Sequence, residues 1–192
     1  GETWQEYLAA HLGEPVRNFG MGGFGVYQAY RRMLRAEESE QGAEYVILYI
    51  WGDDHCRSVM RCRHAATHPW WNGERGLMFH GNFWAHVEMD LDSGDLVEME
   101  NLLSTPDALY KMTDPDFMVD ALKDDLMLQL YVADSVDPST LDLHRLTSLA
   151  EILGVEALDT TSTESLALSS RRLRTAYGFA ATRDIVKKAS DF

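Results

Sequence analysis

The sequence has little of three things that mark common protein classes: cysteine, uninterrupted apolar sequence and positive charge. Only two of the 192 residues are cysteines, which excludes a small fold held together by several disulfides. No stretch approaches the roughly 18 consecutive apolar residues of a membrane-spanning helix, so we expect no membrane span. Lys and Arg number 17 against 31 Asp and Glu, a net charge of −14. This argues against nucleic acid as a partner, because phosphates need a basic surface.

The composition is otherwise that of a globular domain. Hydrophobic residues make up 45% of the chain and charged residues 25%, enough for one domain with a substantial core. The acidic residues concentrate in 88–145, which holds 15 acidic and three basic residues. This pattern indicates a solvated face, although a surface for a basic partner stays open. Both ends look cut, so we expect a piece of a longer protein and leave its compartment open.

Capping signals predict most of the helices. Thr3 and Glu6 have the spacing of a capping box, which predicts a helix from Trp4 to about Leu12 that Gly13 ends. Apolar periodicity predicts a helix over 26–38, with its arginines facing water. Further cap signals predict helices over 114–132, over 138–153, and from about 163 to the end of the chain.

Two apolar segments predict strands and determine the expected fold. They are 15–19 and the nearly continuous apolar run 45–51, and with the helix between them they form a βαβ unit. We therefore expect an α/β fold, a partial three-layer αβα parallel sheet of the SGNH or flavodoxin-like type. Residues 1–55 would form its βαβ part, residues 56–113 an insertion with a β-hairpin around 92–95, and residues 114–192 its helical part.

A Gly-rich turn lies between the first predicted strand and its helix. Gly20, Gly22 and Gly25 match G-x-G-x-x-G, in which glycines let a backbone approach a pyrophosphate at a helix N-terminus. Nucleotide binding through this turn is therefore one hypothesis, although a single match is a weak signal.

A second interpretation uses more of the residues. The stretch Asn18-Phe19-Gly20-Met21-Gly22-Gly23-Phe24-Gly25 and the later stretch Trp51-Gly52-Asp53-Asp54-His55 together resemble the second and third conserved blocks of the SGNH (GDSL-like) hydrolases. The resemblance covers roughly residues 1–60. It implies an ester hydrolase that stabilises an oxyanion with a backbone N–H and an Asn side chain.

The resemblance also implies roles for particular residues. Gly23 would be the backbone donor, and Asp53 takes the place of the family's Asn. Asn18 and His55 would lie near the substrate. The family's serine nucleophile would precede Gly1 and its histidine base would follow Phe192, so we expect the chain alone to be inactive. No cofactor is implied.

The insertion is rich in aromatic and histidine side chains, including three of the five tryptophans. These rings form either a small core or a cap over the site, in which Trp70 and Trp84 would contact a small-molecule ester, with a carbohydrate ester as one option. Cys56, Cys62, His64 and His68 invite a zinc interpretation, but the cysteine spacing is longer than usual for zinc and we expect no metal. A non-catalytic binding or structural domain on the same scaffold is the remaining alternative.

Overall fold

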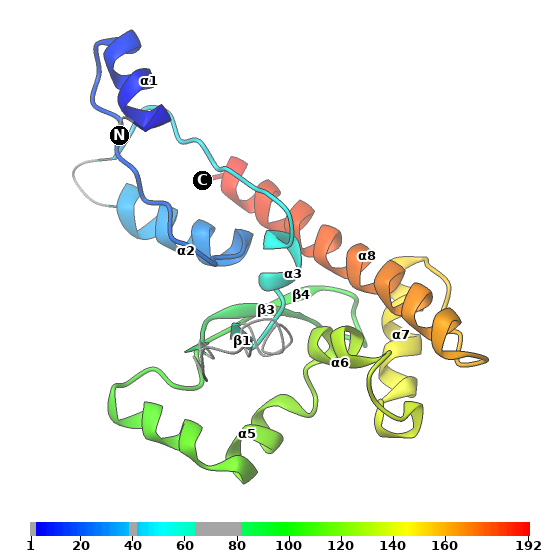
Figure 1. Ribbon diagram of the computed structural model, residues 1–192. Coiled ribbons are helices and arrows are strands. Elements are labelled where there is room, and N and C mark those ends of the chain that lie inside the picture. The colour runs from blue at the N-terminus through cyan, green and yellow to red at the C-terminus, as the bar shows by residue number, and fades with distance from the viewer. Residues whose placement is uncertain (1–2, 39–41, 64–81) are drawn as a thin grey trace.

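A computed structural model describes residues 3–38, 42–63 and 82–192, and helices dominate this part of the chain (Figure 1). The α-helices are α1 (Trp4–Leu12), α2 (Val26–Glu37), α3 (Asp54–Arg57), α5 (Pro115–Leu122), α6 (Leu126–Val132), α7 (Leu143–Leu153) and α8 (Thr163–Ser190). Two 3-10 helices are η1 (Asp107–Thr113) and η2 (Pro138–Thr140). Within the described residues, no helix combines the length and the apolar character needed to cross a bilayer.

The strands form two small antiparallel sheets. One pairs β1 (Cys62–Arg63) with β2 (Asn82–Phe83). The other is a hairpin of β3 (His86–Met89) and β4 (Leu96–Met99), with His86 opposite Met99 and Met89 opposite Leu96. A parallel three-layer αβα sheet was the wrong prediction: the described residues contain only these two antiparallel pairs.

The two predicted strands are extended, but they are not strands of a sheet. Neither 15–19 nor 45–50 makes a backbone hydrogen bond to any described residue. A strand is stabilised by the ladder that it forms with a neighbour, so an apolar extended segment without one remains an isolated extended chain. Of the predicted βαβ unit, the structure therefore contains the helix, α2, but neither strand.

The predicted helices are confirmed with changes at two places. Helices α1 and α2 have the expected bounds to within a residue, and Gly13 ends α1 in the left-handed region at φ +72°. The helix expected over 114–132 is divided into α5 and α6, because Asp125 caps the second of them. The helix expected from 138 begins later, at Leu143, with Asp142 as its cap.

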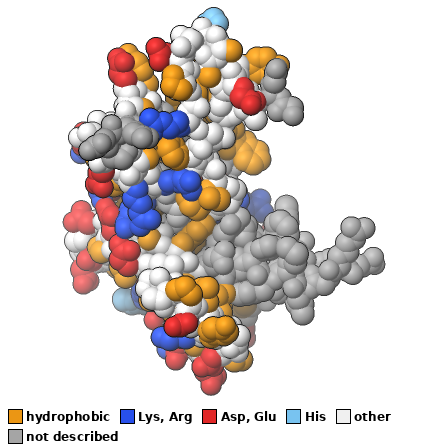
Figure 2. Space-filling view, turned by 90° about the vertical axis from the view of Figure 1, so that its left-hand side faces the viewer, with side chains coloured by type: hydrophobic (Ala, Val, Ile, Leu, Met, Phe, Trp, Pro, Cys, Tyr) orange, Lys and Arg blue, Asp and Glu red, His pale blue; other side chains and the backbone are white. Residues whose placement is uncertain are grey.

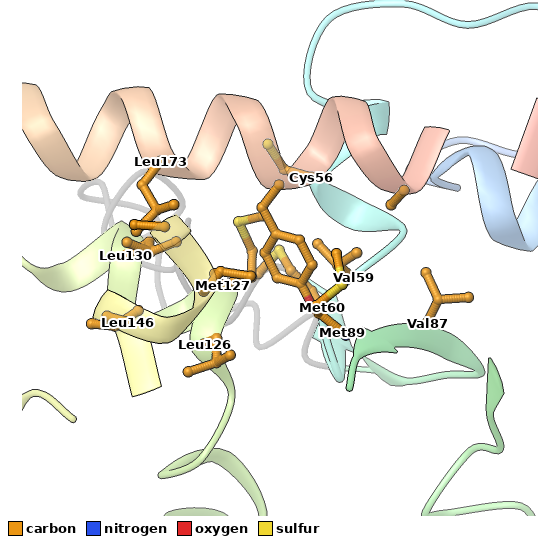
Figure 3. Close-up of a cluster of buried hydrophobic side chains, with 14 of the residues drawn as sticks. Cys56, Val59, Met60, Val87, Met89, Leu126, Met127, Leu130, Leu146 and Leu173 are labelled. Carbon is orange, nitrogen blue, oxygen red and sulfur yellow. The ribbon is translucent and has the colours of Figure 1, made fainter. Parts of the chain in front are cut away.

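The long helix α8 organises the main core. It lies against α2, α3, α6 and α7, and in Figure 3 it runs above clustered side chains that come from α6, α7 and β3 and from the segment after α3. Its buried positions recur every three or four residues, which is the stripe expected of a helix packed on one side. The largest of the fully buried side chains come from α2, α6, α7 and α8: Tyr27, Met127, Leu130, Leu146, Leu149, Leu173, Tyr177 and Ile185.

A smaller cluster lies between the first sheet and the helices α5 and η1. Cys62, Phe83, Leu103 and Ala121 form its buried centre. Helix α1, in contrast, buries none of its residues: Trp4 and Leu12, expected on its apolar face, are both more than half exposed.

Candidate functional site

The Gly-rich turn and the segment after the predicted strand 45–51 meet in the structure. Gly25 caps α2, and its N–H donates to Gln28 Oε1 at 2.9 Å. A Cβ on Gly25 would lie 2.6 Å from Ser58 N and 2.8 Å from the carbonyl carbon of Arg57. The backbone around α3 thus contacts Gly25 where only glycine fits, and Tyr27 N–H donates to Ser58 Oγ at 3.1 Å across the same contact.

Helix α3 is held from its other side by α8. A Cβ on Gly178 would lie 3.1 Å from both Cys56 N and the carbonyl carbon of His55. These distances are tighter than ordinary van der Waals contact. Two glycines far apart in the sequence therefore bring α3 between α2 and α8, an arrangement visible in Figure 1.

Asp53 and Asp54 share one guanidinium at the start of α3. Arg57 Nη2 lies 2.8 Å from Asp53 Oδ1, and Arg57 Nη1 lies 3.1 Å from Asp54 Oδ1. Asp54 also accepts a hydrogen bond from Trp51 N–H at 2.9 Å. The Asp53 carboxylate is therefore accompanied by a half-buried positive charge.

Gly23 and Asn18 shape the Gly-rich turn. Gly23 has φ +82°, in the left-handed region that favours glycine. Asn18 is exposed, and its Oδ1 accepts the Gly20 N–H at 2.8 Å. Both residues lie on the chain segment that leads into α2, the helix that contacts α3.

His55 contacts α8. Its Nδ1 lies 2.9 Å from Thr182 Oγ1, and its ring centre lies 4.3 Å from that of Phe179. The half-buried imidazole is thus held by a hydroxyl and an aromatic ring of the long helix.

Trp84 is buried beside the Gly-rich turn. Its indole N–H donates to the Met60 carbonyl oxygen at 2.7 Å, and its ring meets Phe24 edge to face at 6.4 Å. The structure thus gives Trp84 a packing role and brings it next to the turn. Trp70, the other predicted cap residue, lies outside the described residues.

A cleft of about 640 Å³ lies beside the Gly-rich turn. Helix α2, the turn, and segments next to β3 and after β4 form its walls, and Figure 2 shows basic side chains gathered on this face. The lining residues are Phe19, Phe24, Gln28, Arg31, Arg32, Arg35, Ala36, Trp84, Ala85, Glu100, Asn101 and Ser104.

Within the described ranges, no group of three or more His, Cys, Asp or Glu side chains is placed to hold a metal ion. Cys56 and Cys62 are both buried. Burial raises the pKa of both thiols, that of Cys62 to about 12, so both are protonated at neutral pH. His64 and His68 of the zinc interpretation lie outside the described residues.

The sequence interpretation missed Arg57 and the cleft. The spacing of Arg57, three and four residues after Asp54 and Asp53, is a signal for ion pairs on one helical turn. The cleft has no such local signal, because its walls come from segments more than 45 residues apart.

No protein-family model matches the chain, and neither a curated protein nor a solved structure is similar to it.

Proposed function

We propose that this chain supplies the oxyanion-side loops of an ester hydrolase of the SGNH type. The observation that carries the proposal is the contact between the two segments on which the resemblance depends. Gly25 of the first segment lies directly against Arg57 and Ser58, which follow the second. These segments are more than 25 residues apart in the sequence, and a shared site requires that they lie close together in the fold, as this contact brings them.

The chemistry needs positive or hydrogen-bonding groups near a carbonyl oxygen that becomes negative. The N–H of Gly23 is one such donor, in a turn that only a glycine adopts without strain. An ionised Asp53 alone would repel the oxyanion, but Arg57 at 2.8 Å offsets part of this charge, although Asp54 shares the same guanidinium. The guanidinium thus weakens the objection to an aspartate in the position of the family's asparagine.

The cleft beside the turn offers room for the substrate. Its volume of about 640 Å³ suits a small-molecule ester. Phe19, Phe24 and Trp84 provide rings on which an acyl group or a sugar packs. Nucleotide binding through the Gly-rich turn is less well supported, because the contact with Ser58 already accounts for the glycine at position 25.

The test is hydrolysis by the protein that carries this chain together with a Gly-Asp-Ser block before it and a histidine block after it. We expect turnover of p-nitrophenyl acetate that a serine-directed phosphonate abolishes. The chain by itself, without either block, serves as the inactive control. If the longer protein shows no turnover, the proposal is overturned, and a non-catalytic domain is the interpretation that remains.

Variants of that protein separate the oxyanion site from general stability. Gly23→Ala places a side chain at φ +82° and reorients the donor, so we expect kcat to fall about a hundredfold. Gly13→Ala creates the same kind of strain at φ +72°, where a Cβ meets nothing, and should leave kcat unchanged. Asp53→Asn should keep or raise kcat, since the amide N–H can donate to the oxyanion and the ionised carboxylate cannot, whereas a catalytic acid or base at this position would be lost.

A further inference from the structure

The cleft beside α2 has an unusual charge for this protein. The chain has a net charge of −14, yet the described residues that line this cleft include three arginines and one carboxylate, that of Glu100. Helix α2 provides all three arginines in little more than one turn: Arg31, Arg32 and Arg35. The cleft therefore attracts anions within an acidic surface.

Arg31 is already occupied. Its Nη1 lies 2.9 Å from Glu100 Oε1 and donates to the Tyr27 hydroxyl at 3.0 Å. This arginine holds the wall of the cleft together, because it joins α2 to the segment after β4. Its charge is balanced by Glu100, the one carboxylate among the described residues that line the cleft.

Arg32 and Arg35 carry the uncompensated charge. Neither forms an ion pair with any carboxylate in the part of the chain that the structure describes. The Arg32 guanidinium instead lies 5.8 Å from the centre of the Phe19 ring, and Arg35 is exposed. Two planar, permanently charged guanidinium groups thus line a space that is large enough for a ligand.

The remaining wall is apolar and aromatic. Phe24 and Trp84 meet edge to face, Phe19 is 41% exposed, and Ala36 and Ala85 add small apolar surface. Such a surface favours a flat, apolar body over a fully hydrated ion. The positive charge of the two arginines and the aromatic rings together favour a ligand that is both anionic and flat.

We propose that this cleft binds a small organic anion, in which a phosphate or carboxylate group is attached to a flat apolar body. The guanidinium groups of Arg32 and Arg35 bind the anionic group through charge-assisted hydrogen bonds. The rings of Phe19, Phe24 and Trp84 contact the apolar body. This binding does not depend on the proposed hydrolase, because it uses residues of this chain alone.

Isothermal titration of this chain with phenyl phosphate at low ionic strength tests the proposal. We expect saturable binding that is at least tenfold tighter than that of inorganic phosphate, which lacks the ring, and of phenol, which lacks the charge. Binding should weaken as NaCl is added, since the arginines are partly exposed. Benzoate, run in parallel, distinguishes a carboxylate site from a phosphate site, and tight binding of either ring-bearing anion supports the proposal.

The variant Arg32→Gln/Arg35→Gln removes both free charges and should weaken binding about tenfold or more. Arg183→Gln is the matched control, because Arg183 is an exposed arginine of α8 that does not line the cleft. Circular dichroism confirms that each variant is folded. Binding that is equally weak in both variants, or equal for phenol and phenyl phosphate, would overturn the proposal.

Discussion

Glu88 lies at the centre of a partly buried group of charged side chains. Its carboxylate lies 2.6 Å from Arg61 Nε and 2.9 Å from His86 Nε2. His86 is 2% exposed, and its other ring nitrogen lies 3.1 Å from the Trp84 carbonyl oxygen. These contacts join β3 to the segment before β1, next to the tryptophan that borders the cleft.

Glu88 makes stability depend on pH. Burial acts to raise the pKa of this carboxyl, but hydrogen bonds from His86 and Arg61 and their positive charges lower it to about 2. Because the folded pKa lies below the ordinary value of 4.5, the stabilisation is present above pH 4.5 and is lost as the pH falls toward 2. We expect Glu88→Gln to lower the free energy of unfolding by about 3 kcal/mol at pH 7 and to flatten its fall below pH 4.5.

Urea unfolding at pH 7, 4.5 and 3 measures this effect. Glu156→Gln is the control, because Glu156 forms its ion pair with Arg172 at the surface, with side chains 85% and 70% exposed. Exposed pairs contribute little, so this variant should change stability by less than about 0.5 kcal/mol. Equal effects of the two substitutions would contradict the prediction.

The close contacts of α3 depend on two glycines, and Gly25 is the tighter of them. Gly25→Ala places a methyl group 2.6 Å from Ser58 N and forces α2 and α3 apart. We expect a loss of about 2 kcal/mol, typical of overpacking, and a fall in Tm of about 4–8 °C in a chain of this length. Thermal unfolding followed by circular dichroism gives both values.

Gly22 provides the matched control within the same turn. A Cβ there meets nothing within 4 Å, so Gly22→Ala should leave Tm unchanged or raise it slightly. If Gly22→Ala proved as costly as Gly25→Ala, the turn itself would need its glycines and the contact with α3 would not explain them.

The helices show what a local signal predicts well and where it fails. Caps and apolar periodicity act within one helix, so they placed α1, α2 and α8 closely. The same signals missed the break between α5 and α6. Asp125 is 3% exposed there and accepts hydrogen bonds from Leu128 N–H and from Arg61 N–H, both at 2.9 Å. The second bond comes from a residue 64 positions away, and the apolar periodicity of a helix cannot predict such a distant partner.

At the scale of the whole molecule, the predicted sheet was wrong for the same reason: it depends on contacts between residues far apart in the sequence. A run such as 45–51 indicates that a segment is extended and apolar, but a sheet also needs a neighbour, and pairing is not local. The site was predictable to a similar degree. Gly23 and Asp53 stand out in the sequence, whereas the cleft depends on how α2 lies against Trp84 and Glu100.

Among the described residues, no neighbouring segment pairs with the backbone of residues 45–50. Leu48 and Ile50 pack against the core, while Ile47, Tyr49 and Trp51 are 65%, 73% and 70% exposed. This alternation is that of a strand with one covered face. Unpaired backbone groups with apolar side chains are a ready template for another strand.

Hydrogen exchange tests this description of the segment. We expect amide protons of residues 45–50 to exchange about as fast as those of an unstructured peptide, because no backbone hydrogen bond joins them to the described residues. Amides of α8 between Leu173 and Ile185 should exchange orders of magnitude more slowly, since that part of the helix is packed in the core. Mass spectrometry of peptides from both regions, at one protein concentration and at a tenfold dilution, gives the comparison.

A pair of neighbouring substitutions tests the two faces of the same segment. Leu48→Lys places a charge at the partly buried side against the core and should destabilise the fold by about 1–3 kcal/mol, whereas Ile47→Lys faces solvent and should change stability by less than about 0.5 kcal/mol. Slow exchange at 45–50 that disappears on dilution and in Ile47→Lys would mean that copies of the chain pair through this edge. Slow exchange that persists both on dilution and in Ile47→Lys would contradict the description of 45–50 as a segment without a hydrogen-bonded neighbour.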